Sequence, residues 1–212
     1  MLFLKSFTFN PFQENTYVVY TDDKQALIID PGNSNHLENV TLQKFIAEKE
    51  LRPTRLLLTH AHIDHVLGNR FVFDTYGLLP EVHQNDLFFI ERMPQSAAMY
   101  GVPCDPSPTP KRFLQEGEVI TLGPYTFECL FTPGHSPGSI SFYNAQNKVL
   151  IGGDVLFQGS IGRSDLPMGD HDTLVASIKN KLLVLDDEVN VYSGHGPSTT
   201  IGYERLNNPF LT

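Results

Sequence analysis

The sequence is poor in the features that mark disulfide scaffolds and membrane proteins. Its only cysteines, Cys104 and Cys129, form neither a C-x-x-C pair nor another metal-binding spacing. We interpret them as ordinary thiols of a cytoplasmic protein and leave open one disulfide between them. No apolar run approaches the ~20 residues that span a membrane. The N-terminal segment MLFLKSFTFN lacks the cleavage pattern of a secretion signal and is expected to form a first strand.

Positive charge is scarce as well. The chain has 15 lysines and arginines against 24 acidic residues, a formal net charge of −9. Nucleic acids are bound mainly through clustered basic side chains, and no such cluster is present, so we expect neither a nucleic-acid nor a membrane partner. The oligomeric state stays open. Because 212 residues suit one ordinary domain and no linker interrupts them, we predict a single domain over residues 1–212.

The first half of the chain alternates strand-like and helix-like segments. Short apolar runs bounded by turn residues predict strands, and apolar residues at helical spacing predict amphipathic helices. The expected elements are, in order, strands over residues 14–20 and 25–30, a helix over 35–50, a strand over 55–58, a helix soon after His65, a helix over 84–100 and a loop with four prolines over 101–111.

The second half repeats the order of strands, then a helix, then a strand. Mixed sheets with helices on their outer faces are the economical architecture for such a pattern. The expected elements are strands over residues 118–122, 125–131, 139–144 and 148–153, a helix from Leu174 to Leu185, a strand over 188–192 and a short polar tail.

Most histidines stand beside turn residues at the ends of predicted strands. The segment THAHIDH follows the run RLLL and places three histidines and an aspartate within six residues. The segments TPGHSPG, IGGDVLF and SGHGP each add one more histidine or aspartate. Imidazole and carboxylate are ligands of zinc and similar ions. The candidate metal ligands are His60, His62, Asp64, His65, His135, Asp154 and His195.

The spacing within THAHIDH separates two roles. His60 and His62, two residues apart on an extended segment, can chelate one ion, whereas Asp64 and His65 lie in the following turn and can face a second. Structural zinc sites are closed by four protein ligands and are usually rich in cysteine, so a set of histidines and aspartates favours a catalytic centre over a structural one.

The ordered set IIDPG, THAHIDH, TPGHSPG, GGDVLF and SGHG resembles the metallo-β-lactamase superfamily over essentially the whole chain. The resemblance implies an α/β fold, a four-layer αββα sandwich of two mixed sheets with helices on both outer faces. It also implies two divalent metal ions, with zinc expected and iron or manganese left open. The implied ligands are His60, His62 and His135 for one ion, Asp64, His65 and His195 for the other, and Asp154 as a bridge between them.

Two further stretches, GDVLFQGSIGRSDLP and SGHGPSTTIGYERLNNPF, are similar to the short bacterial glyoxalase II type, the hydroxyacylglutathione hydrolases. The implied reaction is hydrolysis of a small S-acyl thiol by a hydroxide that bridges the ions, with Asp64 and Asp154 catalytic. Longer glyoxalase II enzymes carry an added C-terminal helical domain that contacts glutathione. Only about 17 residues follow His195 here, so we expect no such domain and leave the thiol carrier and the acyl group open.

Other reactions fit the same motifs. Persulfide dioxygenases also resemble this chain, and that resemblance would place one iron on His60, His135 and Asp154. A hydrolase of another ester or a lactone is a further alternative. A thioester is preferred because no additional general acid stands out and a thiol, with a pKa of ~8.5, can leave as thiolate. β-Lactam hydrolysis is not expected, since the superfamily name describes a fold.

Several remaining residues receive lesser roles. Asp30 in IIDPG is expected to order the turn beside the metals. Arg163 and Asp165 in IGRSD either pair with each other or offer Arg163 to a substrate carboxylate. The other histidines stand near predicted helix starts, where surface or capping roles are expected: His36, His83 and His171.

Overall fold

Strands from the first half of the chain form one mixed sheet. The computed structural model describes residues 1–211. The strand order is β1–β2–β3–β4–β5–β6, antiparallel from β1 to β3 and parallel from β3 to β6. The strands are β1 (Leu2–Phe9), β2 (Glu14–Thr21), β3 (Gln25–Ile29), β4 (Arg52–Leu57), β5 (Pro80–His83) and β6 (Arg112–Leu114).

Strands from the second half form another mixed sheet, in the order β14–β13–β10–β9–β8–β7. Its only parallel pair is β10 with β13. The strands are β7 (Val119–Leu122), β8 (Tyr125–Phe131), β9 (Ile140–Asn144), β10 (Val149–Gly153), β13 (Asn190–Ser193) and β14 (Thr199–Thr200), and a separate hairpin comprises β11 (Leu156–Phe157) and β12 (Ser160–Ile161).

Strands such as β2 carry apolar residues on both faces. The inner faces of the two sheets pack against each other, and the outer faces form further cores. In β2, Tyr17 and Val19 enter the core between the sheets, whereas Val18 lies in the core on the outer face. The core between the sheets also holds Phe127 and Phe142, both fully buried. Strands buried on both faces are continuous apolar runs, as the sequence showed.

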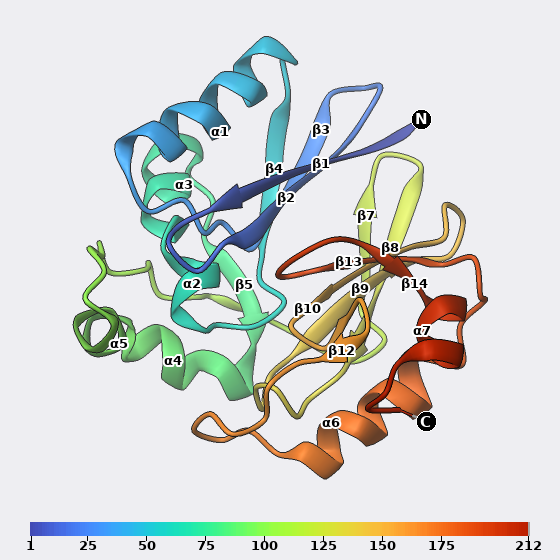
Figure 1. Ribbon diagram of the computed structural model, residues 1–212. Helices are drawn as coiled ribbons and strands as arrows, with labels where there is room; N and C mark the ends of the chain where they lie inside the picture. Colours follow the sequence, from blue (N-terminus) through green and yellow to red (C-terminus); the bar gives the residue numbers. More distant parts are fainter. Residues whose placement is uncertain (212) are drawn as a thin grey trace.

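Helices cover both outer faces and complete the predicted four-layer αββα sandwich, which is confirmed (Figure 1). Helices α1 and α3 pack on the first sheet, and α6, the π-helical turn η2 and α7 pack on the second. None of the helices in residues 1–211 is long and apolar enough to cross a membrane. The helices are α1 (His36–Glu48), α2 (Ile63–Val66), α3 (Asn69–Tyr76), α4 (Leu87–Glu91), α5 (Met93–Tyr100), α6 (His171–Ser177), η2 (Ile178–Leu182) and α7 (Ile201–Asn207).

The region around residues 80–114 differs from the prediction. The single helix expected over residues 84–100 is wrong: a 3₁₀ turn, η1 (Gln84–Asp86), and the helices α4 and α5 occupy it, with a break at Arg92. Pro94 follows the break at the start of α5, where its missing N–H and its ring prevent α4 from continuing. The short strands β5 and β6 were not predicted, because three or four residues carry too little periodic signal.

The C-terminal segment is also more ordered than expected. The predicted polar tail is wrong, since β14 and α7 occupy it. Thr200 caps α7 by accepting a hydrogen bond from the N–H of Tyr203, and Ile201 and Leu211 are buried in the core on the outer face of the second sheet. Few apolar residues suffice to hold α7 in place, because the helix is short and packs on the outer face of the second sheet.

The cysteines are separate within the described part of the chain. Cys129 is buried between the sheets, Cys104 lies in the proline-rich loop, and both are free thiols. The alternative of a disulfide between them is therefore not realised.

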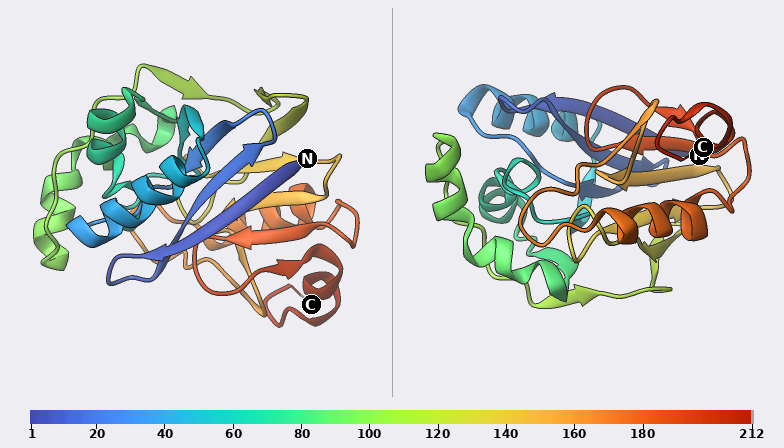
Figure 2. Two further views of the ribbon diagram at one scale, coloured as in Figure 1. Left: turned by 90° about the horizontal axis from the view of Figure 1, so that it is seen from above. Right: turned by 60° about the horizontal axis from the view of Figure 1, so that its bottom comes forward.

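The parallel strands direct their carboxyl ends toward one edge of the sandwich. The loops after β3, β4, β10 and β13 carry most of the predicted site residues, and such ends are the usual place for ligands in α/β sheets. The hydroxyl of Tyr17 donates to the carbonyl of Ser193 (2.6 Å), and the N–H of Ile140 donates to that of Thr59 (2.7 Å), which ties the sheets together there. Helices α4 and α5 lie away from the two chain ends (Figure 2).

Removing a ring from the core between the sheets tests this packing. We expect Phe127→Ala to lower the free energy of unfolding by about 3–5 kcal/mol, because the lost burial leaves a cavity. Val119→Ala on the neighbouring strand β7 is the control, since Val119 is 56% exposed and its truncation should cost little. Urea denaturation of both variants measures the difference, and equal losses would contradict the assignment.

Candidate metal centre

The histidine-rich loop begins where β4 ends. Residues 58–62 form no regular secondary structure, and α2 starts at Ile63, so Asp64 and His65 fall within the first helical turn. Asp30 anchors the loop: its carboxylate accepts hydrogen bonds from the N–H (2.7 Å) and the hydroxyl (2.5 Å) of Thr59. Asp30 itself has a φ of +49°, a left-handed conformation that aspartate tolerates better than most residues.

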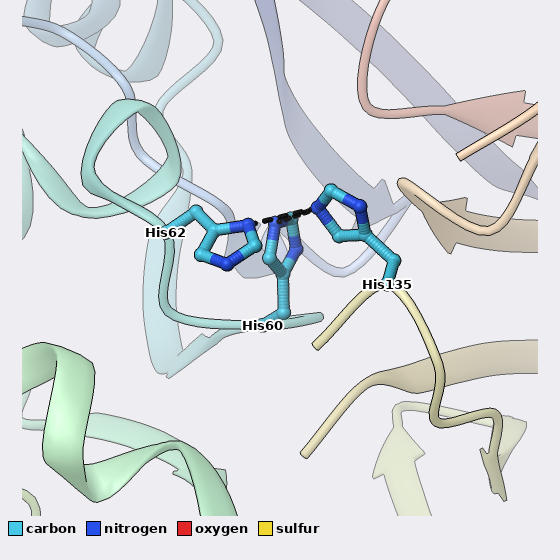
Figure 3. A group of neighbouring side chains, drawn as sticks. All are labelled: His60, His62 and His135. Carbon is cyan, nitrogen blue, oxygen red and sulfur yellow. Dashed lines mark hydrogen bonds between the residues drawn. The ribbon is translucent and has the colours of Figure 1, made fainter. Parts of the chain in front are cut away.

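Three imidazoles converge above the end of β4. The Nε2 atom of His135 lies 2.8 Å from Nδ1 of His62 and 3.2 Å from Nε2 of His60 (Figure 3). His60 and His62 come from the first sheet, whereas His135 comes from the loop between β8 and β9 of the second. One ligand atom from each side chain lies within 4.8 Å of the others, so the three can hold one cation.

A second triad adjoins the first. Nε2 of His195 lies 3.0 Å from Oδ2 of Asp64, and Nε2 of His65 lies 3.7 Å from the same oxygen. These three side chains also bring their ligand atoms within 4.8 Å of one another. His195 follows β13, and its backbone lies against that of Glu14 at the start of β2, so this triad likewise joins the two sheets.

Asp154 lies between the triads. Its Oδ2 is 3.5 Å from Nε2 of His135 and from Nε2 of His195, and its Oδ1 is 3.5 Å from Nε2 of His65. One carboxylate thus contacts a histidine of the first triad and two ligands of the second. The structure brings together all seven residues that the sequence nominated as metal ligands.

In His65, His135 and His195, the ring nitrogen that faces away from the centre has a partner of its own. Nδ1 of His135 donates to the carbonyl of Arg163 (2.7 Å), and Nδ1 of His195 donates to that of Phe12 (3.1 Å). Nδ1 of His65 lies 3.1 Å from Oδ2 of Asp30. Such contacts fix the tautomer and leave the opposite nitrogen, Nε2, directed at the centre.

Burial lowers the pKa of all three histidines of the first triad. Burial, reinforced by the nearby His65, lowers the pKa of His60 well below its ordinary value. Burial and the neighbouring His135 lower the pKa of His62 to about 3, and burial lowers that of His135. These imidazoles are neutral at pH 7, the form in which histidine binds metals.

The second triad and Asp154 form a buried cluster of charged groups. Burial opposes ionisation of Asp64 and Asp154, yet the charge of His65 brings the pKa of both carboxyls below the ordinary value. Burial lowers the pKa of His65, but both aspartates raise it well above normal. Among residues 1–211, the buried atoms His65 Nε2 and Asp154 Oδ1 have no hydrogen-bond partner. A divalent ion replacing the proton would satisfy these atoms.

Two buried carboxylates of the site were missed. Glu14 is fully buried, accepts a hydrogen bond from the hydroxyl of Thr16 (2.9 Å), and has Oε1 3.9 Å from Nδ1 of His65. Burial raises the pKa of Glu14 well above its ordinary value. Asp86, in η1, accepts a hydrogen bond from the N–H of Ala61, which lies between His60 and His62 of the first triad. The only sequence signal was a charged residue next to an apolar run, which is normally a turn.

The remaining nominated residues lie outside the cluster. Arg163 pairs with Asp165 (2.8 and 2.9 Å) at the surface, which is the first of its two expected roles. The three lesser histidines are near helix starts as expected: His36 opens α1, His171 opens α6, and His83 accepts a hydrogen bond from the N–H of Asn85. A pocket of about 280 Å³ opens beside His195, lined also by Phe157, Gln158, Ser160, Gly196 and Pro197.

At Gly194 the backbone passes close to the candidate ligands, so a substitution there tests the arrangement of the cluster. A Cβ there would lie 2.1 Å from Oδ1 of Asp154 and 2.6 Å from Cε1 of His65. We expect Gly194→Ala to weaken metal binding at least about tenfold by displacing these ligands. Gly152→Ala is the matched control, because its Cβ would meet only Val191 at 3.7 Å. Calorimetric zinc titration of both variants decides, and unchanged affinity in Gly194→Ala would refute the arrangement.

Known proteins share these features. Residues 9–195 match the family described as the Metallo-beta-lactamase superfamily. Over 206 residues the chain is 44% identical to hydroxyacylglutathione hydrolase GloC of Haemophilus influenzae, an alignment that covers 94% of this chain and 93% of that protein.

Solved structures give the same result. The fold matches that of BLEG-1 B3 metallo-beta-lactamase with a TM-score of 0.90 and 42% identity, over 99% of this chain and 100% of that chain. It matches TTHA1623 in a di-iron-bound form with a TM-score of 0.88 and 39% identity, over 98% of this chain and 100% of that chain. As its motifs predicted, the chain belongs to the metallo-beta-lactamase superfamily.

Proposed function

We propose that this metal-dependent hydrolase cleaves S-acyl thiols of the hydroxyacylglutathione type with two divalent metal ions. Asp154 carries the proposal, because its carboxylate lies 3.5 Å from histidines of both triads, where a bridging ligand would stand. The proposed ligands are His60, His62 and His135 for one ion, Asp64, His65 and His195 for the other, and Asp154 for both. Residues 1–212 would form one domain, since each triad draws on both sheets.

The charge of the site suits an anionic substrate. Two divalent ions facing the carboxylates of Asp64 and Asp154 would leave a local positive charge, although the chain as a whole carries −9. When bound, such a pair of ions lowers the pKa of a water molecule to about 7 and polarises a carbonyl group. Hydrolysis at neutral pH would then need no side chain to act as a general base.

The protein residues would orient the reactants. Asp64, 3.0 Å from His195, would accept a hydrogen bond from the attacking hydroxide and so direct its lone pair toward the carbonyl carbon. Asp154 would keep the two halves of the site at a fixed separation. No other acid stands over the site among the nominated residues, and a thiolate leaves without one because thiols have a pKa of ~8.5.

The rim supports a carrier with an apolar part and one anionic group. Phe12 and Tyr100 meet edge to face (5.5 Å), Phe89 contacts the ring of His62 (4.9 Å), and Phe157 borders the pocket beside His195. We propose that Arg163 binds a carboxylate of the thiol carrier by exchanging it for Asp165. That exchange costs little, because water screens an ion pair at an exposed surface.

The relatives support this choice at two levels. The name hydroxyacylglutathione hydrolase, borne by the Haemophilus influenzae relative, favours a thioester substrate. The relative with two bound irons favours a dinuclear centre and makes iron a candidate beside zinc and manganese. The relative named a B3 metallo-beta-lactamase makes a β-lactam a necessary comparison substrate.

A substrate panel tests the thioesterase. We expect the protein to hydrolyse at least one S-acyl thiol among lactoylglutathione, an acyl-coenzyme A and an acyl-N-acetylcysteamine. The rate of thiol release measures this hydrolysis. His62→Ala should lower kcat/KM at least about 100-fold by removing a ligand. His36→Ala, a substitution at an exposed histidine, should leave it unchanged. Activity of His62→Ala equal to wild type, or turnover of a β-lactam alone, would reject the proposal.

A one-iron persulfide dioxygenase is the second candidate. The three residues it would use are also adjacent here, since Nε2 of His135 lies 3.2 Å from Nε2 of His60 and 3.5 Å from Asp154. Metal analysis of protein purified without added metal, together with oxygen uptake on glutathione persulfide, separates the two. For the proposed hydrolase we expect two metals per chain and no oxygen uptake. One iron per chain together with oxygen consumption would instead identify a persulfide dioxygenase.

A further inference from the structure

One buried carboxylate links the loops that carry the first triad. Asp86 is fully buried in η1, between β5 and α4. Its Oδ2 accepts the N–H of Ala61 (2.8 Å), its Oδ1 accepts the N–H of Gly138 (2.6 Å), and the hydroxyl of Ser136 lies 2.8 and 3.0 Å from the two oxygens. Both oxygens of the carboxylate therefore face protein donors, namely two backbone N–H groups and one hydroxyl.

These donors belong to the two ligand loops. Ala61 separates His60 from His62, and Ser136 and Gly138 are the first and third residues after His135. The two loops leave different sheets, and one backbone hydrogen bond, from the N–H of Ile140 to the carbonyl of Thr59 (2.7 Å), joins their ends beside the contacts of Asp86. The neighbouring Asn85 adds to the link, because its side-chain amide donates to the carbonyl of Pro137 (3.2 Å).

We propose that Asp86 is a positioning residue that holds His60 and His62 at metal-binding distance from His135. The inference rests on the proposed function only in taking these histidines as the ligands of one ion. Asp86 hydrogen-bonds no histidine among residues 1–211, so it acts through the backbone of the loops. Asp30 differs, since it contacts the ring of His65 directly and thereby supports the second triad.

The packing gives the carboxylate little freedom. A Cβ at Gly138 would lie 2.5 Å from Oδ1 of Asp86, so only glycine lets the second loop approach this closely. Replacing the carboxylate with an amide would turn an NH₂ group toward the N–H of Ala61 or of Gly138. One buried donor would then lose its acceptor, and the loops would separate to relieve the repulsion.

The effect should fall on one metal. Groups that support metal ligands typically change affinity 10–100-fold when they are removed. We expect Asp86→Asn to weaken one of two zinc equivalents at least about tenfold, measured by competition with a chromophoric chelator, and to leave the other within about twofold of wild type. In crystals soaked with zinc, anomalous scattering should fade between His60, His62 and His135 and persist between Asp64, His65 and His195.

Matched variants separate positioning from general destabilisation. Ser136→Ala removes one of the three donors and keeps both backbone contacts, so we expect a smaller loss at the same equivalent. Asp30→Asn, in contrast, should weaken the other equivalent, because Asp30 contacts the ring of His65. Gly138→Ala retains the carboxylate but displaces it, and should reproduce Asp86→Asn. If Asp86→Asn fails to fold by circular dichroism, Ser136→Ala and Gly138→Ala carry the test.

The outcomes distinguish this inference from the proposed function. Wild-type protein that binds fewer than two zinc ions rejects the dinuclear centre itself. Wild-type protein that binds two, with both retained at wild-type affinity in Asp86→Asn and Gly138→Ala, overturns the role of Asp86. Equal weakening of both equivalents in these variants overturns it too, because a merely structural residue would act on both.

Discussion

The site depends on the contact of one carboxylate with imidazoles from both sheets. Asp154 ends β10 and stands 3.5 Å from His135, His65 and His195, each in a different loop. Such a contact is possible only where the strand ends of both sheets meet at one edge of the sandwich. The core between the sheets therefore serves the site directly: its fully buried aromatic and aliphatic side chains set the separation at which the two groups of ligands face each other.

Buried acidic side chains surround the centre beyond the nominated ligands. Asp30, Glu14 and Asp86 are all nearly inaccessible to solvent. Burial of a carboxylate is costly unless hydrogen bonds satisfy it, and Asp30 and Asp86 accept bonds from backbone N–H groups and hydroxyls of the ligand loops. Asp30 and Asp86 each hold one segment of the histidine-rich loop, at Thr59 and Ala61 respectively. These hydrogen bonds hold the proposed ligands in place, which would reduce the cost of assembling a metal centre.

The motifs made the ligands predictable for a local reason. Three histidines and an aspartate stand within six residues, and each further candidate ligand lies beside glycine at the end of an apolar run. Local patterns also predicted the longer strands and α1. They failed where the elements were short, as in β5 and β6, or where Pro94 divided a helix whose apolar pattern continued across the break.

The sequence by itself determined the ligand types, their order and the family, because these depend on residue identity and spacing along the chain. Only the tertiary structure brought the distant candidates together, since His135 reaches His62 across 73 positions of sequence and His195 reaches Asp64 across still more. It also placed the buried carboxylates of Glu14 and Asp86 beside these candidates. A buried carboxylate is recognised by the donors around it, and those donors come from loops that meet only when the two sheets have packed.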